Sequence, residues 1–147
     1  MSEQGEVPYQ WQEADLRRAQ FKNCKLEGAH FQQGLFHGAV FNRFIGEEIV
    51  FRMSNMQRTQ FLNVNLVGAY VNGSNLSNMR IENNKWSDMQ LNDCKVYGLQ
   101  LENSILEDTT IRNAKLRNLN LENCDIAGLM INGIAIDDLL KRTGLLA

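Results

Sequence analysis

The side chains with the clearest chemical potential in this sequence are two histidines and three cysteines. His30 and His37 are the only histidines, and neither has another histidine or a cysteine at metal-ligand spacing. Cys24, Cys94 and Cys124 are an odd number, which makes a poor disulfide framework. Each cysteine stands two residues before a large apolar residue, so we expect three small, buried side chains and surface histidines without a role.

Motifs for other chemistry are missing as well. The sequence contains no glycine-rich phosphate loop, no serine elbow and no paired-carboxylate motif. We therefore predict no catalytic residue, no metal, no cofactor and no enzymatic activity.

Composition limits the classes of partner. The chain has 147 residues, of which 44% are hydrophobic and 22% charged, as in a single soluble domain. Its net charge of −2 argues against direct binding to nucleic acid. Neither a membrane span nor the basic and apolar regions of a signal peptide can be recognised, so we expect a cytoplasmic protein that does not enter the membrane.

The elements that carry these side chains follow a period of five. From Trp11 to Ile136 a large apolar residue stands at every fifth position, and Gly46 is the only exception in twenty-six. Two residues after each of these centres the chain prefers Gly, Asn or Asp, which tolerate left-handed backbone and form turns. A short extended segment followed by a corner, repeated four times, closes a square coil of twenty residues. Successive coils stack at strand spacing, and their centres fill the interior.

Several five-residue units resemble those of a known family. The segments 14–18 (ADLRR), 19–23 (AQFKN) and 114–118 (AKLRN) resemble the A-(D/N)-(L/F)-x-x unit of pentapeptide repeat proteins, and the pattern covers residues 11–136. This resemblance implies an all-β fold, a right-handed quadrilateral β-helix of about six coils. In the second half the small position often becomes Met or Leu, which should widen those coils or shift their turn type.

The two ends lie outside the period. Residues 1–10 form an N-terminal leader or cap, and residues 137–147 are predicted to form a capping helix with Asp137 as N-cap and Gly144 as stop. That helix carries four leucines that could seal the last coil or mediate a homodimer through the C-terminal end: Leu139, Leu140, Leu145 and Leu146.

Gly46 interrupts the ladder without changing its phase. Either this rung is distorted, losing its side chain or bulging outward, or five residues loop out. Around it an apolar collar of four residues occupies positions expected to face solvent: Leu35, Val40, Ile45 and Val50. A bulge that folds back could cover the collar, or the collar could be a docking surface.

Position modulo twenty assigns each charge to a side of the rod. The face centred on Leu26 carries seven acidic and two basic residues, whereas the opposite face, centred on Leu16, carries six basic and three acidic ones. On the adjoining face three glutamates should stack in a column. The candidate interaction surface is therefore acidic: Glu82, Glu102, Glu122, Asp88, Glu107, Asp108 and Asp125.

Two functions remain open at this point. The first is a non-catalytic scaffold that binds a protein partner through a face or the collar. The second follows from the resemblance, because some pentapeptide repeat proteins imitate duplex DNA, bind DNA gyrase and protect it from quinolones or toxins. Regularly spaced carboxylates on a rod would meet a surface built for phosphates. The low net charge, the short rod and the lack of a long loop insertion weigh against this second function.

Overall fold

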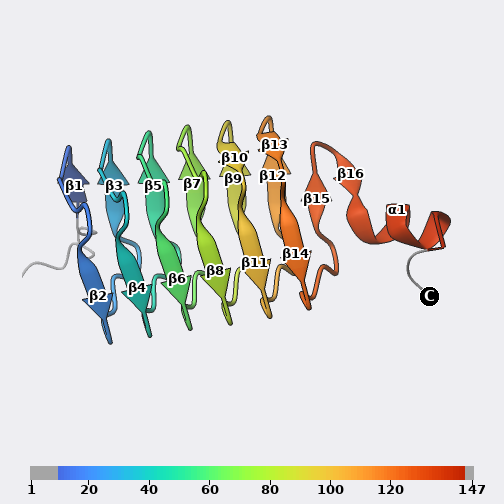
Figure 1. Ribbon diagram of the computed structural model, residues 1–147, viewed down its shortest axis with the longest axis horizontal. Coiled ribbons are helices and arrows are strands. Elements are labelled where there is room, and N and C mark those ends of the chain that lie inside the picture. Colours follow the sequence, from blue (N-terminus) through green and yellow to red (C-terminus); the bar gives the residue numbers. More distant parts are fainter. Residues whose placement is uncertain (1–9, 145–147) are drawn as a thin grey trace, which may run out of the picture.

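In the computed structural model the described residues, 10–144, form a four-sided β-solenoid that ends in one short helix (Figure 1). The helix α1 spans Ile136–Arg142. Most strands have three residues, and they follow each other in the order β1 Gln10–Gln12, β2 Gln20–Lys22, β3 His30–Gln32, β4 Val40–Asn42, β5 Val50–Arg52, β6 Gln60–Leu62, β7 Tyr70–Asn72, β8 Arg80–Glu82, β9 Gln90–Asn92, β10 Lys95–Tyr97, β11 Gln100–Glu102, β12 Thr110–Arg112, β13 Lys115–Arg117, β14 Asn120–Glu122, β15 Met130–Ile131 and β16 Ile134–Ala135.

The strands stack in parallel with a register of twenty residues, except for β16, which pairs antiparallel with β15. One sheet has the order β1-β3-β5-β7-β9-β12-β15-β16, and a second has the order β14-β11-β8-β6-β4-β2. We call their sides the Trp11 face and the Phe21 face. Between them lie the Leu16 face and the Leu26 face, which are connected by isolated parallel bridges and, on the Leu16 face, by the pair β10-β13. The predicted square coil of twenty residues is confirmed.

The corners explain why the period is five. All twenty-five positions from Glu13 to Gly133 that follow a centre by two residues have positive φ, between 48° and 81°. Gly and Asn tolerate this region best, which accounts for their frequency there. Each corner turns the chain so that the centre of the next segment again points inward.

The coils keep their phase through Gly46. Its N–H donates to the carbonyl of Asn65 at 2.8 Å, and Ile45 pairs with Asn65 in the normal register. The expected looped-out segment and outward bulge are therefore both wrong, and the rung simply lacks its side chain. Phe44, at a position that is small in the early coils, occupies that space: a Cβ on Gly46 would lie 2.5 Å from Phe44 Cε1.

The predicted change of turn type in the second half occurs on the Leu16 face. On this face the corner is closed by a hydrogen bond from the N–H three residues after a centre to the carbonyl of that centre. Its length is 3.2 Å from Thr59 N to Met56 O and 3.4 Å from Met79 N to Leu76 O in the next coil. In the next two coils, where Leu99 and Leu119 take this place, no such bond forms within residues 10–144, and the strands β10 and β13 replace the turns. Size alone does not decide the turn, because Leu129 keeps the bond on the Leu26 face at 3.0 Å.

The C-terminal helix is present, but within residues 10–144 it contributes only the half-buried Ile136 to the core at the end of the solenoid. It begins after Ala135, whose side chain makes no capping bond, so the prediction of Asp137 as N-cap is wrong. No residue of α1 is buried, and the inward side chains Leu116 and Leu121 of the last coil stay half-buried. In Figure 1 the helix continues along the rod beyond the last coil. Leu145, Leu146 and residues 1–9 of the predicted leader lie outside the described residues, and the tenth residue, Gln10, begins β1.

Candidate interaction surfaces

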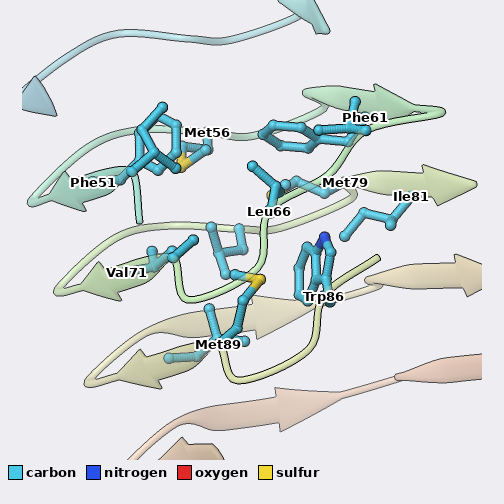
Figure 2. Close-up of a cluster of buried hydrophobic side chains, with 14 of the residues drawn as sticks. Phe51, Met56, Phe61, Leu66, Val71, Met79, Ile81, Trp86 and Met89 are labelled. Atoms are coloured by element: carbon cyan, nitrogen blue, oxygen red, sulfur yellow. The ribbon is translucent and has the colours of Figure 1, made fainter. Parts of the chain in front are cut away.

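The interior of the solenoid is filled with side chains. On the Phe21 face the rings of Phe21, Phe41 and Phe61 stack with centroids 4.5 and 4.7 Å apart. Figure 2 shows the next part of the core, where Met79, Ile81 and Trp86 pack between the coils. The space left there is about 10 Å³, the lower limit for one water molecule. A substrate pocket inside this part of the coil is excluded by packing.

The histidines and cysteines do not assemble into a reactive site. His30 is exposed and His37 is half-exposed, and no three His, Cys, Asp or Glu side chains within residues 10–144 come close enough to hold a metal ion. All three cysteines are free. Cys94 is buried as predicted, and burial raises the pKa of its thiol, which disfavours the reactive thiolate. Cys24 and Cys124 are only half-buried because they lie in the end coils.

The apolar collar reaches the surface on all four faces. Leu35 is 38% exposed, and Val40, Ile45 and Val50 are half-buried. Because no bulge forms near Gly46, the alternative in which such a bulge covers the collar is wrong. The four side chains belong to consecutive segments of one coil, so they surround the rod at a single level.

The predicted column of glutamates is in register. Glu82, Glu102 and Glu122 are Cα partners in the parallel strands β8, β11 and β14. At a strand spacing of about 4.8 Å, three like charges in a row repel each other. Two of them have local partners: Arg80 Nη2 lies 2.9 Å from Glu82 Oε2, and Asn120 Nδ2 donates to Glu122 Oε1 at 3.0 Å.

A second group of carboxylates forms around Asp125 on the Leu26 face. The pKa of Glu107 is raised, chiefly by the charge of Asp125 and by a hydrogen bond with it, with a smaller contribution from Asp108. Asp88 and Asp108 occupy the same corner in consecutive coils. Glu122 and Asp125 stand on either side of the corner at Asn123, while Asp88 and Asp108 occupy the next corner of the Leu26 face. We call the column and this group together the acidic edge.

The pair of positions that Glu107 and Asp125 occupy recurs elsewhere on this face, and there the two side chains are joined by a hydrogen bond without charge repulsion. Asn65 Nδ2 donates to Glu47 Oε1 at 2.9 Å, and Asn65 holds the place in its coil that Asp125 holds three coils later. An amide at position 125 can therefore donate where the carboxylate repels. Asp125 Oδ1 also accepts the N–H of Ala127 at 3.1 Å, a bond that an amide oxygen preserves.

We therefore expect Asp125→Asn to raise the melting temperature at pH 7. A carboxyl group whose pKa is raised by folding binds its proton more tightly in the folded chain, so wild-type stability falls as pH rises from about 4.5 through the folded pKa of Glu107. The gain should shrink below pH 4, where Glu107 is protonated in both states. Thermal unfolding of both proteins from pH 3.5 to 7.5 measures it; an equal gain at all pH values would contradict this electrostatic origin.

Sequence reasoning missed the shape of the basic side. It placed basic residues on the Leu16 face, but not the flat pair of strands β10 and β13 that presents Lys95, Tyr97, Lys115 and Arg117 together. The only available indication was the bulky residue at positions 99 and 119, next to the corners that lose their turn.

The helix α1 presents apolar and charged side chains together. Leu139 is 38% exposed and Leu140 is half-buried, while Ile134, just before the helix, is 51% exposed. The first turn holds two aspartates and the last turn Lys141 and Arg142. No helix within residues 10–144 is long and apolar enough to cross a membrane.

Together, the stacked coils, the positive-φ corners and the filled interior define a four-sided β-solenoid whose candidate sites all lie on its surface. The family model described as "Pentapeptide repeat region" matches residues 14–91. The chain belongs to the pentapeptide repeat family, as its five-residue units indicated.

Solved structures of this family resemble the chain at low sequence identity. QnrB1, a plasmid-mediated fluoroquinolone resistance protein, is 17% identical, with 94% of this chain and 86% of that chain covered and a TM-score of 0.41. Rfr23 from the cyanobacterium Cyanothece 51142 is 15% identical, with coverages of 83% and 86% and a TM-score of 0.31. HetL from Nostoc sp. strain PCC 7120, involved in heterocyst differentiation regulation, is 12% identical, with coverages of 83% and 91% and a TM-score of 0.21. No curated protein matches the sequence. Similarity at this level carries no argument about function.

Proposed function

We propose that this protein is a non-catalytic scaffold that binds a partner protein in the cytoplasm through the apolar collar. The observation that carries the proposal is that the collar lies at the surface although the repeat normally places polar residues there. Leu35 is exposed, and the other three side chains are half-buried. Contiguous exposed apolar area tends to mark an interface.

The collar also fits a partner that wraps the rod or lies across one corner. Adjacent collar residues are five positions apart and belong to neighbouring faces, so two of them can be reached across one edge. Charged residues follow the collar closely, including Arg43, Glu47 and Glu48. An apolar centre with a polar rim is typical of interfaces that form and dissociate.

We expect Val40→Ser/Ile45→Ser/Val50→Ser to lose partners that wild-type protein retains in a pull-down from cytoplasmic extract. The change removes apolar contact area at the surface while leaving the inward centres untouched. Gln60→Ser/Asn65→Ser/Tyr70→Ser, at the equivalent positions of the next coil, is the matched control and should retain the partner. A partner that binds the collar variant as well as wild type would refute the collar as the docking site.

A second function is favoured by the acidic edge: mimicry of DNA towards DNA gyrase. The in-register glutamates and the raised pKa of Glu107 show a high density of negative charge on one side of the rod. Such a row could engage a surface that binds phosphates. Added protein should then alter gyrase supercoiling or its quinolone sensitivity, and Glu102→Gln/Glu122→Gln should weaken the effect. Unchanged supercoiling and sensitivity would reject the mimicry.

The C-terminal end supports a homodimer as part of the same proposal. Leu139 and Ile134 are exposed there, and within residues 10–144 only β16 and α1 follow the half-buried last coil. Opposite charges at the two ends of α1 would also pair between antiparallel helices. Sedimentation of wild type and Ile134→Asp/Leu139→Asp compares the oligomeric states directly.

A further inference from the structure

The face of the β10–β13 sheet carries a compact group of cations around one aromatic ring. Residues 95 and 97 of β10 and residues 115 and 117 of β13 point outward, because they alternate with the inward centres, the buried Val96 and the half-buried Leu116. We call Lys95, Tyr97, Lys115 and Arg117 the basic sheet patch. Its three cations are exposed and Tyr97 is half-buried. The loss of the turns on this face makes the patch flat.

The cations of the basic sheet patch lack carboxylate partners. Lys95 and Lys115 are Cα partners in register, so two like charges stand directly opposite each other, which is destabilising. Within residues 10–144 the ion pairs are Arg17–Asp15 and Arg80–Glu82, and neither involves this patch. An anionic ligand placed over both lysines would remove the repulsion.

Tyr97 holds two of these cations in place. Lys95 Nζ lies 5.4 Å from the centroid of the tyrosine ring, and Arg117 Cζ lies 5.1 Å from it. A cation over an aromatic face is attracted to it and loses side-chain freedom before any ligand arrives. The guanidinium keeps N–H donors at its edge, and these donors suit a carboxylate in a bidentate arrangement.

We infer that the basic sheet patch is a docking surface for a short acidic segment of a partner protein. Three cations on two strands match two or three carboxylates rather than a long phosphate backbone. Glu102 and Glu122 on the adjoining Phe21 face would repel a nucleic acid that extended past the corner. A second copy of this chain would have to use its acidic Leu26 face. Because the two faces lie on opposite sides of the rod, each copy would bind the next, and the copies would form an open polymer rather than a closed dimer.

The test uses the full chain and a fluorescein-labelled hexaglutamate peptide, with binding read by fluorescence anisotropy. We expect wild type to bind and Lys95→Glu/Lys115→Glu to bind at least about tenfold more weakly, because two attractions become repulsions. Lys22→Glu/Arg43→Glu makes the same change in net charge on another part of the rod and should bind like wild type. Raising salt from about 50 to about 300 mM should weaken the wild-type complex.

The single variant Lys115→Glu shows whether a loss of peptide binding arises from unfolding of the protein or from the loss of the binding surface itself. This change turns a like-charge pair into an opposite-charge pair, so its melting temperature should equal or exceed that of wild type while peptide binding falls. Three results would overturn the inference: equal loss in Lys22→Glu/Arg43→Glu, tighter binding of a DNA oligonucleotide than of the peptide, or self-association that Lys95→Glu/Lys115→Glu abolishes.

Discussion

Replacing Gly46 by leucine, which completes the apolar repeat, is expected to destabilise the protein by about 1–3 kcal/mol. The repeat suggests a vacancy at this rung, but a Cβ there would lie 2.5 Å from Phe44 Cε1 and 3.1 Å from Leu66 Cδ2. Phe44 is only 1% exposed and packs edge-on against Phe41 with centroids 4.9 Å apart. The leucine would have to displace this ring. Urea unfolding followed by circular dichroism measures the loss.

A double-mutant cycle identifies Phe44 as the cause. Phe44→Ala alone leaves a cavity and should cost about 3–5 kcal/mol. In Gly46→Leu/Phe44→Ala the leucine refills that cavity, so the double variant should be more stable than Phe44→Ala. The coupling between the two sites should therefore exceed the cost of Gly46→Leu alone, about 1–3 kcal/mol. Two independent, additive losses would show that the ring and residue 46 do not share one space.

A glycine that only marks a corner is the matched control. Gly28 has a φ of 68°, and no atom lies within 4 Å of a Cβ built on it. Asparagine is frequent at such corners and tolerates this backbone. Gly28→Asn should therefore change the free energy of unfolding by only about 0.5 kcal/mol, although it also enlarges a glycine.

The coil could be predicted from sequence because its rules are local. A centre, a corner and a fixed period determine which side of the rod each residue occupies, and so the glutamate column was placed correctly. The filling of the Gly46 rung could not be predicted in this way. It depends on Phe44, which lies at the nominally small position two residues before Gly46 and fills the space of the missing centre.

The flat basic sheet patch escaped prediction for a related reason. Corner residues alone suggest the same turn in every coil, since Gly98 and Asn118 have positive φ like their equivalents elsewhere. The loss of the turn bond accompanies a bulky Leu99 and Leu119, yet Leu129 on another face keeps its bond. Turn type therefore depends on packing between coils, which no single five-residue unit contains.

The second large effect is expected for Phe41→Ala, with a loss of about 3–5 kcal/mol. Phe41 is fully buried, and its ring stacks between those of Phe21 and Phe61, while the ring of Phe44 packs nearly perpendicular to it with centroids 4.9 Å apart. Removing it takes contacts from the coils on both sides. Small domains are stable by only about 5–15 kcal/mol, so this one change should remove a large part of the total. Chemical denaturation of the full chain tests the value.

Phe21→Ala is the control that distinguishes position along the rod from ring size. Phe21 stands in the same column and stacks on Phe41 at 4.5 Å, but it lies in an end coil and is half-buried. In a solenoid, stability is close to a sum over coils and their interfaces, so an end residue contributes to fewer interfaces than a central one. Phe21→Ala should cost about half as much as Phe41→Ala. Equal losses would contradict this sum over coils and would show that position along the rod does not set the cost.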